Sequence, residues 1–468
     1  MKDRLLFFTD RDNGRDVEML LPLRFFAEEL LGLSVQHAFL YDYDAIRRYK
    51  PITVVLPNTI GSHEFFFISK YCFDQKIPVF ALDSEGNFRT DGTFNHWGYN
   101  TDQTYYQEYI CCWSNRTRDY LISKEPLYKE KIVTVGGVGF DRYKIYRFME
   151  KDDYFKLRKT SKYDYVVGYA SWAFGKMHYN KGRDSLVSYF KGDRSKLSIM
   201  EQQRKEVEEI LKHSIEHNPD VLFILKKHPL ERRPTELGDA RNEINNLRDY
   251  PNVIIEEGEI SIGDLINVCD VWLSFESTTA IEAWLLNKPT ILIRTNPQFT
   301  NTLEEKGLVD SQCIADTSIS LQNYIHNLKE KGLISEFKDE EKHKNRKEVV
   351  NKSIGFDDGF NHIRAGIYLY KTTQAFSQKE VKYRFRVKSF IIWLLILLGR
   401  TFYIKSIYKR FPLVKKFVWV FEEYGLENVA QLYERKKPYL KEFYNENKIK
   451  ELYDSGKLEK MLFENVMN

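Results

Sequence analysis

The chain contains the stretch Val221-Leu222-Phe223-Ile224-Leu225-Lys226-Lys227-His228-Pro229, in which an apolar run ends abruptly in basic residues, a histidine and a proline. A short apolar run bounded by a turn signal is typical of a buried strand in a parallel sheet. A second such run ends in Ser274-Phe275-Glu276-Ser277-Thr278-Thr279-Ala280-Ile281-Glu282-Ala283. Both polar turns are therefore predicted at the carboxyl ends of parallel strands, where open α/β sheets bind their ligands.

Short apolar runs and helix-like segments alternate through most of the chain, which predicts α/β domains with parallel sheets built from βαβ units. A polar segment rich in lysine and tyrosine, around residues 141–164, interrupts the alternation. We therefore expect two Rossmann-like, doubly wound domains over 1–145 and 165–372, a linker over 146–164, and a helical, basic extension over 373–468. The expected strands cover residues 4–8, 52–56, 78–82, 132–135, 165–169, 221–225, 253–256, 271–274 and 290–293.

The net charge of +4 is unevenly distributed along the 468 residues. Between Lys379 and Lys416 there are 11 lysines and arginines and one acid, Glu380, so this segment carries +10 and the rest of the chain −6. A nucleic-acid enzyme usually carries positive charge over its main body, so this distribution argues against a nucleic-acid partner. The five cysteines have neither disulfide-scaffold density nor metal-ligand spacing, and the N-terminus becomes polar too early for a signal peptide. A reduced cytoplasmic location is expected.

The extension contains nine consecutive apolar residues at 390–398, with basic residues on both sides. Nine residues are too few to span a bilayer, which requires about 20. Basic flanks around an apolar segment are typical of a helix that lies in the interface of an anionic membrane. We expect residues 382–416 to bind the inner face of the cell membrane as a peripheral anchor. The alternative is a helix packed on its own domain, with its basic residues simply solvated.

The hydroxyl-rich turn after residue 274 is a candidate phosphate site. Serine and threonine cap helices readily, and the free amides of a helix start, together with the helix dipole, favour an anion. Glu282, one and a half turns further on, is placed to accept hydrogen bonds from a ribose. The alternative is a capped crossover helix without a ligand. The candidate donor-binding residues are Lys227, His228, Pro229, Ser274, Glu276, Ser277, Thr278, Thr279 and Glu282.

His228 follows its strand directly, beside two lysines and before a proline that holds the loop. A histidine in this position can donate a hydrogen bond to a leaving phosphate. The alternative is a loop histidine whose hydrogen bonds are satisfied within the protein. Its place one unit before the hydroxyl-rich turn favours the functional interpretation.

In the first half, the expected strand 78–82 is followed by Asp83-Ser84-Glu85-Gly86, which predicts a carboxylate at a strand end. Such a carboxylate can act as general base on an acceptor hydroxyl, although a solvated loop acid is the alternative. Gly86 and the glycines of Gly136-Gly137-Val138-Gly139 permit either a close approach of backbone to a ligand or a turn. Asp42-Tyr43-Asp44 matches the Asp-x-Asp metal motif of another transferase fold, but it lies in a tyrosine-rich helix-like segment and is interpreted as coincidence. Neither a metal nor a cofactor is expected.

In this order the motifs resemble the bacterial GT-B glycosyltransferases that use CMP-activated sugars, which include sialyltransferases and the β-Kdo transferases of capsule and lipopolysaccharide assembly. The resemblance is strongest to surface carbohydrate biosynthesis proteins. Their pattern is Asp-Glu-Glu-Gly, an aromatic-Trp-Gly segment, Gly-Asn-x-Arg-x-Asp and a Ser/Thr-Thr-Ala-x-Glu-Ala helix. The matching segments, within residues 1–370, are Asp83-Ser84-Glu85-Gly86, Cys112-Trp113-Ser114, Gly136-Gly137-Val138-Gly139-Phe140-Asp141 and Ser277-Thr278-Thr279-Ala280-Ile281-Glu282-Ala283.

The resemblance implies that Glu85 is the catalytic base and that His228 contacts the donor phosphate. It also implies that Ser277 and Thr278 hold the same phosphate, with Thr279 as a further candidate. The chain departs from the pattern at Ser84, Ser114, Gly137 and Gly139, which replace an acid, a glycine, an asparagine and an arginine. These departures leave the donor nucleotide open.

The resulting hypothesis is a metal-independent glycosyltransferase that moves a sugar, such as Kdo or another CMP-activated acidic sugar, to a surface polysaccharide or glycolipid. A single carboxylate base suits one inverting displacement, although Glu276 and Glu282 keep a double displacement open. The alternatives are a CDP-polyol phosphotransferase of the teichoic-acid type, a UDP-sugar-dependent GT-B enzyme such as an epimerase, and a non-catalytic nucleotide-binding scaffold of the assembly machinery.

Overall fold

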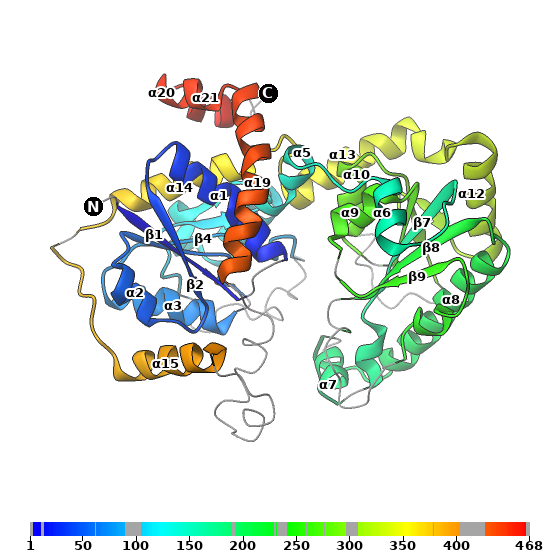
Figure 1. Cartoon of the computed structure of the whole chain (residues 1–468), viewed down its shortest axis with the longest axis horizontal. Coiled ribbons are helices and arrows are strands. Elements are labelled where there is room, and N and C mark those ends of the chain that lie inside the picture. The colour runs from blue at the N-terminus through cyan, green and yellow to red at the C-terminus, as the bar shows by residue number, and fades with distance from the viewer. Residues whose placement is uncertain are drawn as a thin grey trace. The chain divides into compact units, whose positions relative to one another are not determined.

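The structure is a computed structural model (Figure 1). It describes residues 3–10, 14–60, 62–88, 104–178, 180–189, 192–228, 231, 241–258, 260–275, 277–295, 308–377, 379–401 and 426–464. The chain divides into two compact units, of which the first comprises Met1–Tyr146 with Lys352–Asn468 and the second comprises Arg147–Asn351.

The first unit contains a six-stranded parallel sheet in the order β2-β1-β3-β4-β5-β6. Alternate residues of β1 point to opposite faces, as the pleat requires. Leu6 and Phe8 pack with α2 and α3, whereas Leu5 and Phe7 pack with α1 and α14. Because both faces are covered, the strands are nearly continuous hydrophobic runs. The strands are β1 (Arg4–Thr9), β2 (Ser34–Phe39), β3 (Thr53–Leu56), β4 (Val79–Ala81), β5 (Ile110–Cys112) and β6 (Ile132–Thr134).

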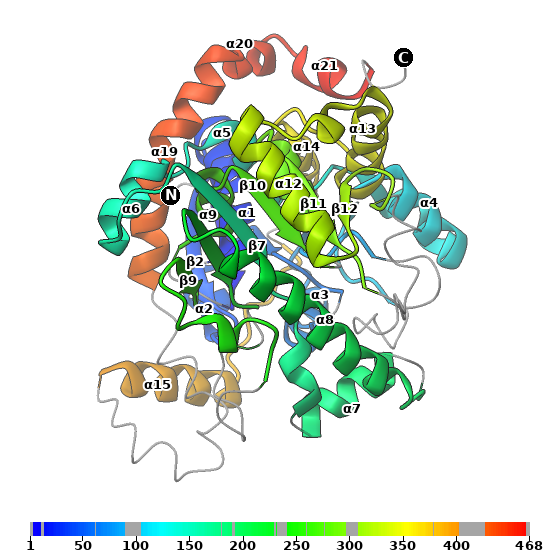
Figure 2. The ribbon, with the colours of Figure 1, turned by 90° about the vertical axis from the view of Figure 1, so that its right-hand side faces the viewer.

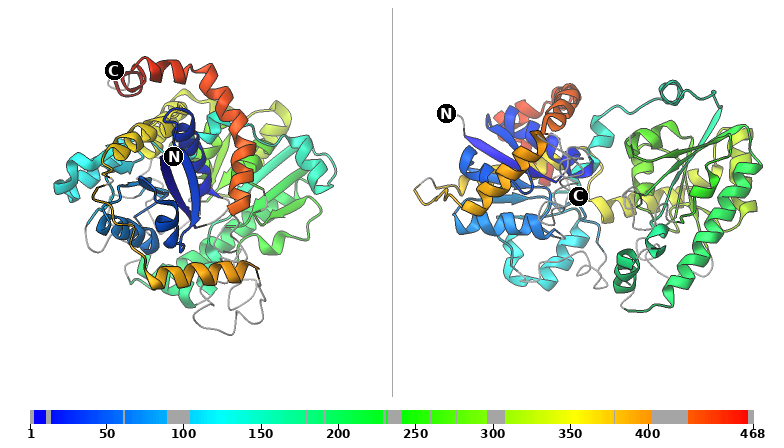
Figure 3. Two further views of the ribbon diagram at one scale, coloured as in Figure 1. Left: turned by 60° about the vertical axis from the view of Figure 1, so that its left-hand side comes forward. Right: turned by 60° about the horizontal axis from the view of Figure 1, so that its bottom comes forward.

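Helices from both ends of the sequence surround this sheet. α19 packs on α1 (Figure 3), and its Tyr433 and Leu440 side chains are buried. The Tyr433 hydroxyl donates to Glu28 Oε2 over 2.6 Å. The helices are α1 (Arg15–Glu29), α2 (Asp44–Tyr49), α3 (His63–Asp74), α4 (Asn115–Lys124), α5 (Arg142–Ile145), α14 (Asn361–Gln374), α15 (Val387–Thr401), α19 (Leu426–Glu446), α20 (Ile449–Asp454) and α21 (Leu458–Glu464), with short 3₁₀ helices η2 (Pro126–Lys131) and η3 (Val138–Phe140).

The second unit contains another six-stranded parallel sheet, in the order β12-β11-β10-β7-β8-β9 (Figure 2). One face packs against α8 and α12, and the other packs against α6 and α9. Gly168 of β7 lies against the buried ring of Trp272 in β10, and a Cβ atom at position 168 would come within 2.3 Å of Trp272 Cε3. The strands are β7 (Tyr165–Ala170), β8 (Val221–Lys226), β9 (Val253–Glu256), β10 (Val271–Ser274), β11 (Thr290–Ile293) and β12 (Cys313–Ala315).

The helical segments of the second unit follow the strands in the alternation that the sequence predicts. They are α6 (Lys151–Arg158), η4 (Phe174–His178), α7 (Asn180–Tyr189), α8 (Lys196–Glu216), η6 (Asn245–Leu247), α9 (Ile262–Val268), α10 (Thr279–Leu285), α12 (Ser318–Lys331) and η7 (Ser335–Lys338), after which α13 (Glu340–Ile354) leads the chain back to the first unit.

All nine expected strands are present, but β2, β5 and β12 were not expected. Polar residues within β2 explain the first omission, since its sequence is Ser-Val-Gln-His-Ala-Phe. His37 packs edge-on against Phe7 at 5.7 Å between ring centroids. Burial, with a smaller contribution from the charge of Arg24, lowers the pKa of His37 to about 3, so this histidine is neutral at physiological pH. β5 and β12 each contain only three residues.

The units also divide the chain differently from the expected boundaries of 145, 164 and 372. Residues 147–164 belong to the second unit, because α6 contributes Tyr154 and Arg158, which both bond Glu256 Oε1 over 2.7 Å. The residues after 352 return to the first unit and supply part of its core. Among the described residues, no helix is long and apolar enough to cross a membrane.

Asp141 holds the start of α14, where the chain has returned to the first unit. Its carboxylate is fully buried and accepts hydrogen bonds from the Asn361 backbone N–H (3.2 Å), the His362 backbone N–H (2.6 Å) and His362 Nδ1 (2.8 Å). Burial raises the pKa of Asp141, while the bonds from His362 act in the opposite direction. One carboxylate therefore satisfies three donors at the start of α14.

Replacing Asp141 with alanine should destabilise the first unit, because three buried donors would lose their acceptor. The expected loss is about 3 kcal/mol, since each unsatisfied buried polar group costs roughly 1–3 kcal/mol. Chemical denaturation followed by circular dichroism measures it. Asp152→Ala, which removes an exposed ion pair with Lys162, is the control and should leave the midpoint unchanged. Equal midpoints for both variants would contradict the fastening role.

Candidate functional site

The sheet of the second unit has a switch point between β7 and β10. From β7 the chain adds β8 and β9 on one side and then returns to add β10, β11 and β12 on the other. Ligands of open α/β sheets bind beyond the carboxyl ends of the strands at such a reversal. In the register of the sheet, Ala170 at the end of β7 pairs with Lys226 of β8 and with Ser274 of β10. The structure thus brings the basic turn and the hydroxyl-rich turn to one edge.

The hydroxyl-rich turn is arranged differently from the expected helix cap. α10 begins at Thr279 and ends at Leu285. Ser277 Oγ accepts from the Thr279 backbone N–H at 3.3 Å, and Thr279 Oγ1 accepts from Trp272 Nε1 at 3.0 Å. Thr279 is therefore engaged within the protein, and Thr278 is exposed. Glu282 lies buried in the first turn of α10, and Glu276 lies outside the described residues.

Two buried hydroxyl groups at this edge have no hydrogen-bond partner within the described part of the chain. They are Ser274 Oγ at the end of β10 and Thr295 Oγ1, which follows the neighbouring β11. Ser274 is 0% and Thr295 is 3% exposed. Buried polar groups in proteins are normally paired, so such exceptions indicate a place that a ligand or water can satisfy. Thr295 was not predicted, because an isolated threonine after a strand has no distinguishing signal.

The basic turn, residues 226–228, continues the hydrogen bonding of the sheet for one residue beyond β8, and a backbone turn follows. The Lys227 backbone N–H donates to Glu256 O at 2.9 Å, and the Glu231 backbone N–H donates to His228 O at 2.9 Å. The Lys227 side chain is buried, with Nζ 3.8 Å from Glu257 Oε1. His228 is half-buried, and Pro229 lies outside the described residues. The edge therefore carries a buried cation next to the candidate histidine.

Two glutamates, the buried Glu243 and the half-buried Glu231, hold the loop after β7, and the sequence did not predict either as a site residue. Glu243 Oε1 accepts from the Tyr169 hydroxyl and from the Trp172 backbone N–H, both at 2.9 Å. Glu231 Oε1 accepts from the Gly175 backbone N–H at 2.6 Å. Burial, together with the negative charge of Glu231, raises the pKa of Glu243 to about 8. Burial also raises the pKa of Glu231, although its hydrogen bonds and the charges of neighbouring lysines oppose the shift.

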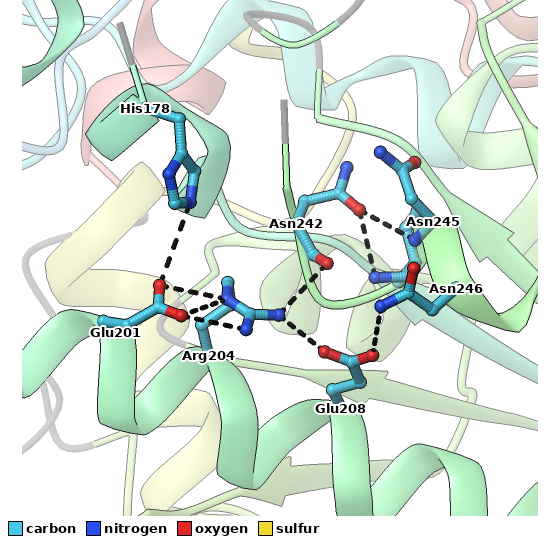
Figure 4. A network of polar contacts seen from close by, with 8 residues as sticks. His178, Glu201, Arg204, Glu208, Asn242, Asn245 and Asn246 are labelled. Atoms are coloured by element: carbon cyan, nitrogen blue, oxygen red, sulfur yellow. Dashed lines mark hydrogen bonds and ion pairs between the residues drawn. The ribbon is translucent and has the colours of Figure 1, made fainter. Parts of the chain in front are cut away.

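A polar network around Arg204 of α8 includes Asn242, which connects it to Glu231; Figure 4 shows Arg204 and Asn242. Asn242 Nδ2 donates to Glu231 Oε2 at 2.9 Å, and the Asn242 carbonyl accepts from Arg204 Nη1 at 3.4 Å. Arg204 also bonds two acids of its own helix, Glu201 and Glu208. The residues labelled in Figure 4 are His178, Glu201, Arg204, Glu208, Asn242, Asn245 and Asn246. The loops at the carboxyl edge are thus supported by α8 as well as by the sheet.

In the first unit, the turn that carries Glu85 is held by main-chain and side-chain bonds. Asp83 Oδ1 accepts from the Glu85 backbone N–H at 2.9 Å, and the Asp83 carbonyl accepts from Trp113 Nε1 at 2.6 Å. A Cβ atom at Gly86 would come within 2.4 Å of Trp113 Cγ, so only glycine fits there without displacing the indole. Glu85 itself is exposed. Asp83 therefore shapes the turn, and the Glu85 side chain projects from it.

The arginine of α4 extends this support to the residues that follow. Arg116 Nη2 donates to Asn87 Oδ1 at 2.7 Å, and Nη1 donates to the Phe88 carbonyl at 3.0 Å. The backbone around Glu85 is therefore fixed from both sides of the turn, by Trp113 and by Arg116.

The glycines after β6 make contacts within the first unit. Gly136 has a φ of +87°, and a Cβ atom there would lie 1.9 Å from Asn361 Oδ1. The Gly137 backbone N–H donates to Ile354 O at 2.8 Å, and Gly139 lies in η3. Close packing on the returning chain is sufficient to explain Gly136 and Gly137, so their role as cleft residues stays a prediction.

Among the described residues, no three histidine, cysteine or acidic side chains gather in a way that could hold a metal ion. The Asp42-Tyr43-Asp44 segment has another role. Arg48 bonds both aspartates, and Arg47 bonds Asp44 over 2.9 Å. These ion pairs fix the start of α2.

Solved structures share this architecture over most of the chain. MnaA from Staphylococcus aureus, determined with UDP, has a TM-score of 0.51 and 11% identity, covering 82% of this chain and 100% of MnaA. A Listeria monocytogenes protein proposed to be a UDP-N-acetylglucosamine 2-epimerase has a TM-score of 0.52 and 10% identity, with coverage of 82% and 100%. The chain has the GT-B fold. At these identities the likeness establishes the fold alone. No protein-family profile and no curated protein sequence matches the chain.

Glu243 should make stability depend on pH. Because its pKa is raised from 4.5 to about 8, the folded protein retains a proton that the unfolded chain releases, so stability should fall as pH rises through that interval. Glu243→Gln retains an oxygen for both donors and does not titrate. Its thermal midpoint should therefore fall less than that of the wild type between pH 5 and pH 8.

Thermal unfolding at a series of pH values gives this comparison. Glu209→Gln, at an exposed position of α8, is the matched control and should follow the wild type. Parallel curves for Glu243→Gln and the wild type would show that Glu243 does not carry the proton.

Proposed function

We propose that the chain is a metal-independent glycosyltransferase that transfers a sugar from a nucleotide donor to a surface polysaccharide or glycolipid. The observation that carries the proposal is the single row Lys226–Ala170–Ser274 at the switch point of the second unit. This row places the basic turn that contains His228 beside the buried Ser274 hydroxyl, which has no hydrogen-bond partner among the described residues. This combination suits a phosphate, which needs positive charge and several hydrogen-bond donors.

The donor phosphate would be held by Lys227, His228 and the hydroxyls of Ser274 and Ser277, with the ribose hydrogen-bonded to Glu282. Lys227 supports this role because a buried ammonium group attracts an anion more strongly where water is excluded. The buried position of Glu282 in the first turn of α10 likewise suits a fixed hydrogen-bond acceptor. The resemblance favours a CMP-activated acidic sugar, such as Kdo.

Glu85 would act as the general base on the acceptor hydroxyl. In an inverting displacement, the acceptor oxygen forms a bond to the anomeric carbon while the bond from that carbon to the donor phosphate oxygen breaks. The hydroxyl proton passes to the Glu85 carboxylate, and the negative charge that develops on the leaving phosphate is stabilised by Lys227 and His228. The rigid turn around Glu85 supports this assignment, since a base must be held in position.

A panel of nucleotides tests the donor proposal. CMP, CDP, UDP and GDP are added separately, and the shift in thermal midpoint is recorded. Binding to the folded state raises the midpoint, so CMP should give the largest shift if a CMP-sugar is the donor. His228→Ala should weaken that binding about tenfold, as expected for loss of a charged hydrogen bond. His326→Ala, on the exposed side of α12, is the control. No shift with any nucleotide would remove the donor proposal.

The panel also separates the alternatives. A preference for CDP, followed by release of CMP from a CDP-polyol, would favour the phosphotransferase. UDP binding with interconversion of a UDP-sugar in the absence of acceptor would favour an epimerase, whose fold the chain shares. Binding without any turnover would favour the scaffold.

Glu85→Gln separates catalysis from binding. Turnover should fall by about 100-fold or more, the usual contribution of a general base, while nucleotide affinity stays at the wild-type value. Donor consumption in the presence of a membrane-derived acceptor measures turnover. Glu130→Gln, another exposed acid of the first unit, is the control and should retain full activity. A fully active Glu85→Gln variant would show that another group removes the proton.

A further inference from the structure

The helix α15 presents an exposed apolar face. Val387, Ile391, Leu394 and Leu395 are 63%, 48%, 37% and 38% exposed, respectively. Their spacing of four, three and one residues places them along one side of the helix. Together they form the outer face of α15.

The opposite side of the same helix is anchored on the first unit. Ile392 packs against the core cluster that includes residues of α2 and α3. The Arg48 guanidinium lies 5.0 Å from the ring centroid of Trp393, and Ser389 is buried. α15 therefore lies lengthwise beside α2, as Figure 1 shows. Because the inner side is fixed by these contacts, the outer face keeps a defined direction.

An anchored helix with apolar residues on both sides is unusual at a protein surface. A surface helix normally has one apolar side and one polar side, and a helix that is apolar all round is normally covered. Contiguous exposed apolar surface marks a place of interaction. The outer face offers no hydrogen-bonding group at residues 391, 394 and 395, so its partner is expected to be apolar.

Basic side chains border the outer face at its N-terminal end. Lys382, Arg384, Arg386 and Lys388 are all exposed, and the Arg386 guanidinium lies 4.4 Å from the ring centroid of Tyr71. The segment that carries them is held in place: the Tyr383 hydroxyl donates to Pro51 O at 2.8 Å, while the Arg384 backbone N–H donates to Gln75 Oε1 at 3.1 Å. The backbone of this basic segment is therefore held on the first unit just before α15 begins.

We propose that the outer face of α15 inserts into the interface of an anionic lipid bilayer, with the four basic residues against the lipid headgroups. An aliphatic face bordered by basic residues matches the two layers of such a surface, hydrocarbon below and negative charge above. With 15 residues the helix is about 22 Å long, too short to span the roughly 30 Å hydrocarbon layer. It therefore lies in the plane of the interface.

A second copy of this chain fits the face less well than a bilayer. Two copies would bring equal positive charges together, and like charges oppose association. The proposal does not depend on the proposed function, because it concerns a surface remote in sequence from the candidate donor and acceptor residues. If both proposals hold, an enzyme bound to the membrane through α15 could reach a glycolipid acceptor in the same membrane.

Flotation of the full-length protein with vesicles tests the proposal. Vesicles of phosphatidylcholine alone are compared with vesicles of phosphatidylcholine mixed with phosphatidylglycerol, at low and high salt. The wild-type protein should bind the mixed vesicles, and added salt should weaken that binding. Ile391→Glu with Leu394→Glu should reduce binding at least about tenfold, because two carboxylates would have to enter the apolar layer.

Matched controls separate lipid docking from loss of folding. Leu127→Glu with Ile319→Glu changes two other exposed apolar residues, which are 94% and 68% exposed, and should bind vesicles as the wild type does. Both double variants should retain the wild-type thermal midpoint and nucleotide affinity, since all four positions are exposed.

Three outcomes would overturn the proposal. The α15 double variant could bind vesicles as well as the wild type, or the wild type could bind neutral and anionic vesicles equally weakly. Alternatively, light scattering could show that the wild type forms a dimer without binding vesicles and that the α15 double variant is a monomer. That last result would assign the face to a second copy of the chain.

Discussion

The pairing of β10 with β7 is the constraint on which the candidate donor site depends. It aligns Ser274 with Ala170, and Ala170 is aligned with Lys226 on its other side. The pairing is close because Gly168 makes room for the Trp272 ring, whose indole nitrogen then donates to Thr279. A side chain at position 168 would force the two strands apart. The basic turn and the hydroxyl-rich turn, 45 residues apart from Pro229 to Ser274, become neighbours because β8 and β10 both pair with β7.

Two acids stabilise the loops around that edge at some cost. Glu243 is removed from water and Glu231 is partly removed from it, which is unfavourable for two negative charges close together. The cost is limited because both carboxylates receive hydrogen bonds and because Glu243 retains its proton up to about pH 8. The same bonds hold the loop after β7 in place. In the first unit, hydrogen bonds from Trp113 and Arg116 hold the turn that carries Glu85 in the same way.

Much of this fold was predictable from the sequence, because each buried parallel strand is a continuous apolar run that ends in a turn. Strand β2 was missed because Gln36 and His37 interrupt its apolar pattern, although His37 is partly buried and neutral in the structure. The compact units divide the chain differently from the expected boundaries for a different reason. Local pattern gives no sign that residues after 352 return to the first unit, since that return depends on long-range contacts such as those of Asp141 with His362.

The positions of the candidate site residues were predictable, but their contacts were not. Strand ends located Glu85, His228 and the turn after Ser274, but hydrogen-bond partners could not be read from the sequence. Thr279 looked like a phosphate ligand, yet its hydroxyl accepts from Trp272. Glu243 and Thr295 gave no signal, because a lone acid or threonine in a loop is common. Their importance arises only from burial.

Hydrogen–deuterium exchange of the full chain, with and without the nucleotide that stabilises it most, tests the donor site most directly. The account predicts slower exchange in the peptides that contain residues 222–228 and 272–279, with no change in α12. Protection confined to the first unit, or no protection at the carboxyl edge of β7, β8 and β10, would contradict the assignment of the donor phosphate to this edge.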